Sequence, residues 1–165
     1  MAQKKSIAII GATEKNGEEI AIQLSQGDYD LLLISNNKEA LDHLSERIKT
    51  RELKAEINFI ECVKEGCWEA DIIILAIPHD EEKRAAEIMK EVATQKIVVD
   101  FSNEKNAGDE LNSILPYSKV VRISGDFPSK EIIISGDNKA ANEEILEIFN
   151  QVGYHAVIEN QAHKN

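Results

Sequence analysis

The sequence has few of the residues that mark special classes of protein. It contains two cysteines and three prolines in 165 residues, and no apolar run approaches the roughly 20 residues needed to cross a bilayer. Cys62 and Cys67 have no second cysteine pair and no neighbouring histidine, so neither a zinc site nor a disulfide framework is expected. The short apolar stretch after the N-terminal lysines continues into polar residues, which indicates a strand rather than a signal peptide. We therefore expect no metal, no membrane contact and a cytoplasmic location.

Positive charge is also scarce, with 19 Lys and Arg against 30 Asp and Glu and a formal net charge of −11. A partner such as nucleic acid or an anionic membrane requires a basic face, so neither is expected. The composition, 42% hydrophobic and 30% charged, is typical of a folded globular chain. The length fits one domain, which we place at residues 1–160, followed by a C-terminal tail at 161–165.

Apolar runs alternate with amphipathic segments along the chain. Buried strands are expected at residues 6–10, 31–34, 55–63, 71–77, 96–101, 119–123, 131–134 and 154–158. Apolar residues at helical spacing lie between them and predict helices, the first of which Gly27 should end in the left-handed conformation. A short helix is also expected over Asp109–Leu115. The expected core faces of the other four helices, in chain order, are Ile20, Ala21 and Leu24; Leu41, Leu44 and Ile48; Ala85, Ile88, Met89, Val92 and Ala93; and Ala141, Ile145, Ile148, Phe149 and Val152.

This alternation predicts a single α/β domain with a doubly wound, mainly parallel sheet. In such sheets ligands bind beyond the C-terminal ends of the strands, where the strand order reverses. With a strand order of 3-2-1-4-5, the loops at that edge are residues 11–17, 35–38, 77–80 and 102–106.

The turn after the first strand has the character of an anion site. Gly11 allows a sharp turn, and Gly17, which has no Cβ, allows the following helix to lie close to the sheet. The free amides and the dipole at the start of a helix attract a phosphate group. The predicted contacts of a nucleotide pyrophosphate are therefore Gly11, Ala12, Thr13, Lys15, Asn16 and Gly17.

Glu14 stands where turns of this kind usually have a middle glycine. A carboxylate about 4 Å from a phosphate costs ~1 kcal/mol in water and ~4 kcal/mol at an intermediate dielectric. A left-handed backbone at a non-glycine residue would add ~1–2 kcal/mol. If Glu14 faces the pyrophosphate, binding is badly weakened. If it points to solvent while Lys15 points to the ligand, the site survives, and both arrangements fit the sequence.

The end of the second strand indicates which dinucleotide is preferred. An Asp or Glu there would bind both ribose hydroxyls of NAD, but this chain has Ser35, 24 residues after Gly11, then Asn36, Asn37 and Lys38. Small polar residues followed by a cation favour the 2′-phosphate of NADP, so NADP is predicted over NAD. In the alternative interpretation, one of the two asparagines only caps the next helix and Lys38 is solvated.

Two further loops would hold the nicotinamide half of the cofactor. His79 follows directly after the fourth strand, and a catalytic role would require an orienting partner such as Asp80 or Asp100. In the alternative interpretation it is a loop or capping histidine, and no catalytic residue is assigned. The candidate cofactor contacts in these loops are Ile77, Pro78, His79 and Asn103.

Four segments together carry a family resemblance: Ile7–Gly17, Ala70–Pro78, Lys96–Asn103, and Ser135–Asp137 with its helix and the following Val-Gly-Tyr. In this order they resemble the NADP-binding domain of the coenzyme F420-dependent NADP oxidoreductases. The wider relatives of that family include pyrroline-carboxylate reductases and the cytosolic domains of membrane ferric reductases. The resemblance implies a Rossmann-like NAD(P)-binding fold and hydride transfer between NADP(H) and a flavin-like or deazaflavin-like acceptor.

The chain departs from the family pattern at three places. Glu14 replaces a glycine, Ser35-Asn36-Asn37 replaces the Ser-Arg that grips the 2′-phosphate, and the region after the sixth strand is brief. Two hypotheses follow. One is a small NADP-linked oxidoreductase whose acceptor side comes from a second subunit, which implies a homodimer. The other is a non-catalytic Rossmann-fold module, a nucleotide sensor or partner-binding subunit, that has lost tight cofactor binding.

Overall fold

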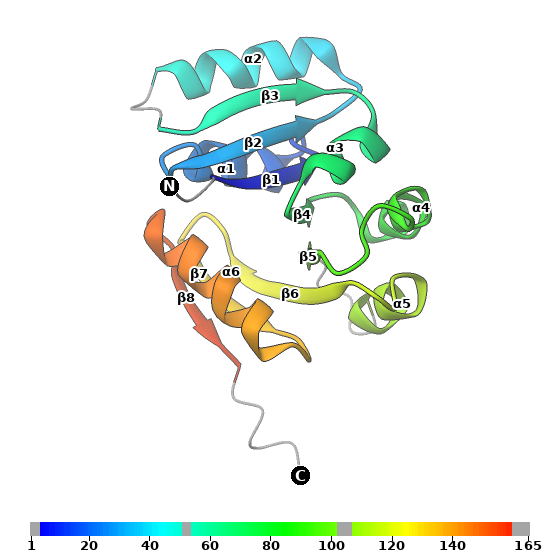
Figure 1. The fold of residues 1–165 in the computed structure, drawn as a ribbon. Helices are drawn as coiled ribbons and strands as arrows, with labels where there is room; N and C mark the ends of the chain where they lie inside the picture. The colour runs from blue at the N-terminus through cyan, green and yellow to red at the C-terminus, as the bar shows by residue number, and fades with distance from the viewer. Residues whose placement is uncertain (1–3, 51–53, 102–106, 160–165) are drawn as a thin grey trace.

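The computed structural model describes residues 4–50, 54–101 and 107–159, and it forms one α/β domain built on a single sheet (Figure 1). The sheet has eight strands in the order β3-β2-β1-β4-β5-β6-β7-β8. Every neighbouring pair is parallel except β6 and β7, which form an antiparallel hairpin. The predicted order of the first five strands and the mainly parallel, doubly wound sheet are therefore confirmed.

The elements follow one another along the chain in the expected alternation of strand and helix. Their bounds are β1 (Lys5–Ile10), α1 (Lys15–Leu24), β2 (Tyr29–Ile34), α2 (Lys38–Lys49), β3 (Glu56–Ile60), α3 (Val63–Glu69), β4 (Ile72–Leu75), α4 (His79–Met89), β5 (Ile97–Asp100), α5 (Ala107–Ile114), β6 (Lys119–Asp126), β7 (Glu131–Ser135), α6 (Lys139–Gln151) and β8 (His155–Ile158). No helix within the described ranges is long and apolar enough to span a membrane.

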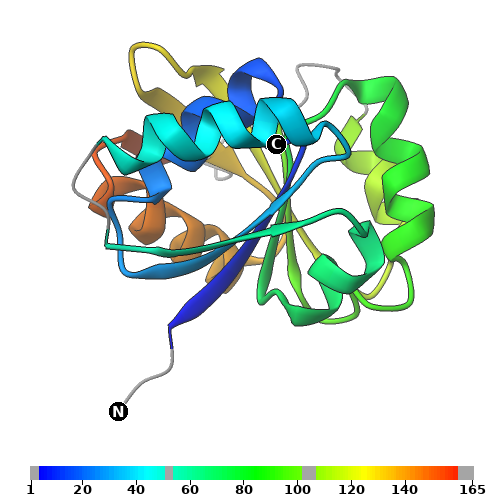
Figure 2. The ribbon, with the colours of Figure 1, turned by 90° about the horizontal axis from the view of Figure 1, so that it is seen from above.

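Helices cover both faces of the sheet and divide the core into two layers (Figures 1 and 2). Helices α1, α2 and α6 pack on one face, where Ile20, Leu44 and Phe149 are fully buried. Helices α3, α4 and α5 pack on the other face, around Cys67, Met89 and Leu111. Strands β1 and β4 lie between the two layers, which explains why their sequences are apolar without alternation.

Several predicted elements differ from the structure. Helix α1 ends at Leu24 with Ser25 as C-cap, and Gly27 is not among the residues with positive φ, so the predicted left-handed glycine cap is wrong. Helix α3 was not predicted, because its seven residues are too few to show a helical period. Its first residue, Val63, had been assigned to the third strand, which ends at Ile60.

The helix after β4 and the turn that follows it bury the predicted face at every position but one, with Ala93 buried and Val92 half-buried as expected. Ala85 and Met89 are buried as expected, but Ile88 is 44% exposed and Glu82 is buried in its place. Periodicity favoured Ile88 as the buried residue because carboxyl side chains are rarely buried.

The two cysteines are free thiols, and both ends of helix α6 are set by local backbone and side-chain features. Cys62 is exposed, Cys67 is buried, and neither forms a disulfide. Burial raises the pKa of Cys67 to about 12, so its thiol stays protonated and unreactive. Asn138 caps α6 by accepting a hydrogen bond from the Ala141 amide, and Gly153 follows that helix with φ of +99°.

Candidate functional site

A large cleft lined by described residues lies at the C-terminal edge of the sheet and has a volume of about 660 Å³. It is formed by the ends of β1, β2 and β3, the segment after β4, and one face of α4. This is the place where strand order reverses between β1 and β4, as predicted. Its lining residues are Ile10, Gly11, Thr13, Glu14, Ile34, Ser35, Asn36, Asn37, Glu61, Val63, Ile77, Asp80, Glu81, Arg84, Ala85 and Ile88.

The turn from β1 into α1 is held tight by its two glycines. Gly11 has φ of +85°, a conformation that favours glycine, and a Cβ there would overlap the carbonyl oxygen of Ala76. A Cβ at Gly17 would overlap the carbonyl oxygen of Gly11. Both positions therefore require glycine, and they bring the first turn of α1 directly against the end of β1.

The backbone amides of this turn fall into two groups. The amides of Gly11 and Ala12 donate to the Ile34 carbonyl at 3.2 and 3.4 Å, so they tie β1 to β2. Ala12 is also fully buried, so its side chain does not face a ligand in the cleft. The Glu18 amide makes the first helical bond, to the Glu14 carbonyl, at 2.8 Å. The three amides before it, from Lys15 to Gly17, are the ones that the helix leaves for an anion.

Glu14 is the N-cap of α1, with φ of −74° and ψ of 160°. This is ordinary extended backbone, so the left-handed strain considered from the sequence does not arise. Its side chain makes no capping hydrogen bond, is exposed, and lines the cleft. Lys15 and Asn16 are exposed on the first turn of α1 and do not line the cleft. The carboxylate therefore has solvent on one side and the anion position on the other.

The end of β2 is ordered by a small hydrogen-bond network. The Ser35 and Thr13 hydroxyl oxygens are 2.9 Å apart, which joins the two turns that floor the cleft. Ser35 Oγ also accepts the Asn37 amide at 3.1 Å, and Asn37 Oδ1 accepts the Ala40 amide at 3.1 Å. Asn37 is thus the helix cap, as one interpretation predicted, and Asn36 is left exposed in the cleft. Lys38 starts α2, is exposed, and does not line the cleft.

One wall of the cleft was missed by sequence reasoning. It is a face of α4 whose members recur at helical spacing: Asp80, Glu81, Arg84, Ala85 and Ile88. The spacing i, i+1, i+4, i+5, i+8 was visible in the sequence, but periodicity assigned the apolar members to the core. The exposed carboxylates of this wall add to those of Glu14 and Glu61, so the cleft is rich in negative charge.

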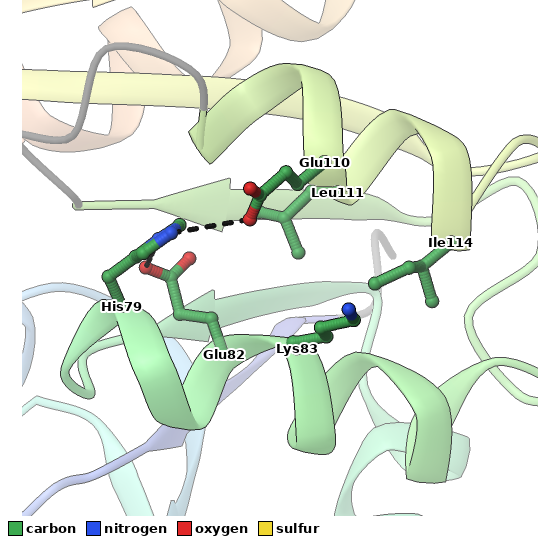
Figure 3. A pocket seen from close by; sticks show the side chains of 6 residues that line it. All are labelled: His79, Glu82, Lys83, Glu110, Leu111 and Ile114. Carbon is green, nitrogen blue, oxygen red and sulfur yellow. Dashed lines mark ion pairs between the residues drawn. The ribbon is translucent and has the colours of Figure 1, made fainter.

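His79 lies on the other flank of α4, in a second and much smaller pocket (Figure 3). Its Nε2 is 3.2 Å from Glu110 Oε2 on α5, and its Nδ1 is 3.7 Å from Glu82 Oε1. The partners of His79 are thus these two glutamates rather than Asp80 or Asp100, which had been predicted. The imidazole joins α4 to α5 and does not line the large cleft.

Glu82 is the buried carboxyl of this small pocket, with 2% of its side chain exposed. Burial raises its pKa to about 9, and the neighbouring carboxyl of Asp100 acts in the same direction. Burial in the folded protein therefore favours the protonated, neutral form of Glu82. This protonation explains how a glutamate occupies a position where an apolar residue was expected.

Three predicted contacts remain to be placed. Ile77 lines the cleft and is half-buried, and Pro78 is exposed as the N-cap of α4. Asn103 lies outside the described residues, as does the rest of the loop at 102–106. No group of three or more metal-binding side chains that could hold an ion was found in the described part of the chain.

The fold and the turn after β1 define a class of protein, the Rossmann-like domains that bind pyridine dinucleotides. Residues 6–104 match the family model described as NADP oxidoreductase, coenzyme F420-dependent. The chain belongs to this family, which places it among the NAD(P)-dependent oxidoreductases. No curated protein matches the sequence.

Solved structures with the same fold include members of related families. One is a protein assigned as an F420-dependent NADP reductase from Arthrobacter sp. FB24, with a TM-score of 0.72, 17% identity, and coverage of 92% of this chain and 82% of that one. Another is the pyrroline carboxylate reductase of Plasmodium falciparum with NADP bound, with a TM-score of 0.72, 15% identity, and coverage of 98% and 59%. A third is the pyrroline-5-carboxylate reductase of Coxiella burnetii, with a TM-score of 0.72, 16% identity, and coverage of 98% and 60%.

At these identities the similarity establishes the fold alone. The chain spans about three fifths of the length of the two pyrroline-carboxylate reductases. The remaining two fifths of those proteins have no counterpart in this chain.

Proposed function

We propose that this protein is a small NADP-linked oxidoreductase that transfers hydride between NADP(H) and a flavin-like, deazaflavin-like or other small acceptor. When bound, the dinucleotide would supply the hydride, and the acceptor would take up both electrons with a proton from solvent. The chain's own contribution would be binding and orientation, which are the main protein contributions to a reaction of this kind.

The observation that carries the proposal is the close approach of α1 to β1. No side chain fits between Gly17 and the Gly11 carbonyl, so the ten-residue helix α1 begins directly beside Gly11, Thr13 and Glu14, which line the cleft. Amides and dipole at this position suit a diphosphate. Thr13, Lys15, Asn16 and Gly17 would bind it, with Gly11 and Ala12 holding the shape of the turn.

The two halves of the dinucleotide would extend in opposite directions from this point. Ser35 and Asn36 line the cleft beside the turn and would bind the adenosine ribose and its 2′-phosphate, with Lys38 as a more distant cation. The nicotinamide would lie at Ile77 and Pro78, beyond β4. Helix α4 begins with His79, which would act by holding the α4–α5 junction that borders this half.

The acceptor side would come from a second subunit. The chain covers 59% and 60% of the two pyrroline-carboxylate reductases, so surface for an acceptor would come from elsewhere. A homodimer is the simplest source of that surface. Analytical ultracentrifugation in the presence of NADPH should then give a mass of twice the monomer, and a monomer at all concentrations would contradict this part of the proposal.

One observation favours a rival function. Four carboxylates, from Glu14, Glu61, Asp80 and Glu81, line the cleft, and they weaken the binding of any phosphate. A chain with this cleft could serve as a non-catalytic module that no longer binds the cofactor tightly.

Fluorescence titration with NADPH and with NADH separates the two functions. The oxidoreductase predicts saturable NADPH binding in the micromolar range, weaker NADH binding, and oxidation of NADPH when FMN or a 5-deazaflavin is added. Saturable binding without turnover of any acceptor would favour a nucleotide sensor. If neither cofactor binds saturably, the oxidoreductase proposal fails and the partner-binding module remains.

A further inference from the structure

Arg84 is the one basic side chain among the described residues that line the large cleft. It lies on α4, opposite the turn after β1, and not at the end of β2 where a cation was expected from the sequence. The ion pairs found among the described residues do not include Arg84. Its guanidinium is therefore available to a ligand in the cleft.

The flank of α4 that carries Arg84 is the one that lines the large cleft. Helix α4 packs between α3 and α5, so one of its sides contacts α3 and another contacts α5. His79, Glu82 and Lys83 line the small pocket on the α5 side. The Lys64–Glu91 ion pair, with 3.2 Å between Nζ and Oε2, closes the α3 side. Arg84 lies on the flank directed away from α5, where the cleft continues to β3 and the start of α3.

The cleft at this flank contains the polar groups that would surround an adenosine ribose. Ser35 and Asn36 lie at the end of β2, and Glu61 lies just beyond the end of β3. Helix α3 packs against β1, β2 and β3 and also against α4, so the α3 side of α4 is the side nearer to β2. The amides that suit a pyrophosphate belong to α1, at the end of β1. Arg84 thus lies on the β2 side of the pyrophosphate position, where the 2′-phosphate of the adenosine ribose would lie.

The negative charge of the cleft opposes the binding of a ligand that carries both a diphosphate and a 2′-phosphate, so such a ligand needs a cation in the cleft. Four carboxylates line the cleft against this single guanidinium, and the chain as a whole carries −11. Arginine binds phosphate with two parallel N–H donors, which a lysine cannot do. Lys38, the candidate from the sequence, starts α2 outside the cleft lining and has Glu39 beside it.

We propose that Arg84 binds the 2′-phosphate of NADP(H) from the α4 wall and thereby determines the preference of this protein for NADP over NAD. The inference rests on the proposed function. It assigns to α4 a recognition role that the chain lacks after β2, where Asn36 and Asn37 stand in place of arginine.

The test measures the dissociation constants of NADPH and NADH for wild type, Arg84→Ala, one matched control and one variant of the competing cation. Lys83→Ala removes the same charge from the neighbouring position of the same helix, on the α5 side. Lys38→Ala removes the candidate cation of the sequence. Adenosine 2′,5′-bisphosphate and 5′-AMP serve as probes of the adenosine half alone, and thermal unfolding checks that each variant folds.

Arg84→Ala should weaken NADPH and the bisphosphate roughly tenfold or more, as expected for a charge-assisted contact, and change NADH and 5′-AMP less than about twofold. Arg84→Lys should recover part of the loss. An equal loss for NADPH and NADH, or a loss as large in Lys83→Ala or Lys38→Ala, would overturn the inference while leaving the cofactor-binding function in place. If wild type binds neither dinucleotide, both this inference and the proposed function are wrong.

Discussion

Glu14 offers the most informative perturbation of the proposed site, because it is a negative charge at the mouth of an anion-binding turn. Replacing it by glutamine removes the charge and keeps the shape and the extended backbone of the N-cap. At about 4 Å in water, one unit charge costs ~1 kcal/mol against each nearby phosphate charge. For a diphosphate whose second charge lies farther from Glu14, the total repulsion is about 1–1.5 kcal/mol. Removing this repulsion corresponds to roughly a five- to tenfold change in the dissociation constant.

We therefore expect Glu14→Gln to bind NADPH and NADH about five- to tenfold more tightly than wild type, measured by fluorescence titration at low ionic strength. The gain should shrink as salt is added, since Glu14 is exposed and its field is screened over about 10 Å at 0.1 M. Glu65→Gln is the matched control, because Glu65 lies in the first turn of α3 and does not line the cleft. Unchanged affinity in Glu14→Gln, or an equal gain in Glu65→Gln, would refute the placement of the pyrophosphate at this turn.

Three further predictions concern the stability of the elements around the site. Glu82→Gln should gain stability relative to wild type as the pH rises from about 5 to about 8, measured by urea unfolding. The pKa of Glu82 is raised to about 9 in the folded state and lies near 4.5 in the unfolded chain, so the free energy of unfolding of wild type falls by up to ~1.4 kcal/mol per pH unit in this range. A stability difference that does not change with pH would contradict this prediction, and the exposed Glu87→Gln serves as the control. Gly17→Ala should lower the unfolding free energy by ~1–3 kcal/mol and abolish NADPH binding, since its methyl group meets the Gly11 carbonyl, and normal binding would disprove the tight turn. Asn37→Ala should cost ~1 kcal/mol by removing the cap of α2, whereas Asn36→Ala should leave stability unchanged; equal effects of the two would contradict the cap.

The sheet topology could be predicted because most strands are recognisable from their own local sequence. The runs at β1, β4 and β5 are apolar on both faces, and the helices between them have clear apolar stripes, so the right-handed crossover rule leaves few arrangements. Gly11 and Gly17 were found for the same reason, since a turn that needs glycine shows it in the sequence. The two short or irregular features, helix α3 and the end of α1, gave no such signal.

The α4 wall of the cleft could not be predicted, because it depends on how the helix is rotated about its axis. Glu82 faces inward with its proton, and this rotation turns Ile88 and Arg84 toward the cleft. Hydrophobic periodicity assumes that a carboxyl faces water, and that assumption fails where burial and a neighbouring Asp100 keep the carboxyl neutral. The same rotation turns His79 toward Glu110 and away from the dinucleotide position.

The central claim is that the first amides of α1 bind the diphosphate of a pyridine dinucleotide. The most direct test is to follow the backbone amide resonances of the labelled protein while NADPH is added. We predict saturable shifts at Lys15, Asn16 and Gly17, with further shifts at Ser35 and Asn36 and none along β7 and β8. Saturable shifts confined to another surface, or no shifts at the start of α1 at millimolar NADPH, would contradict the claim.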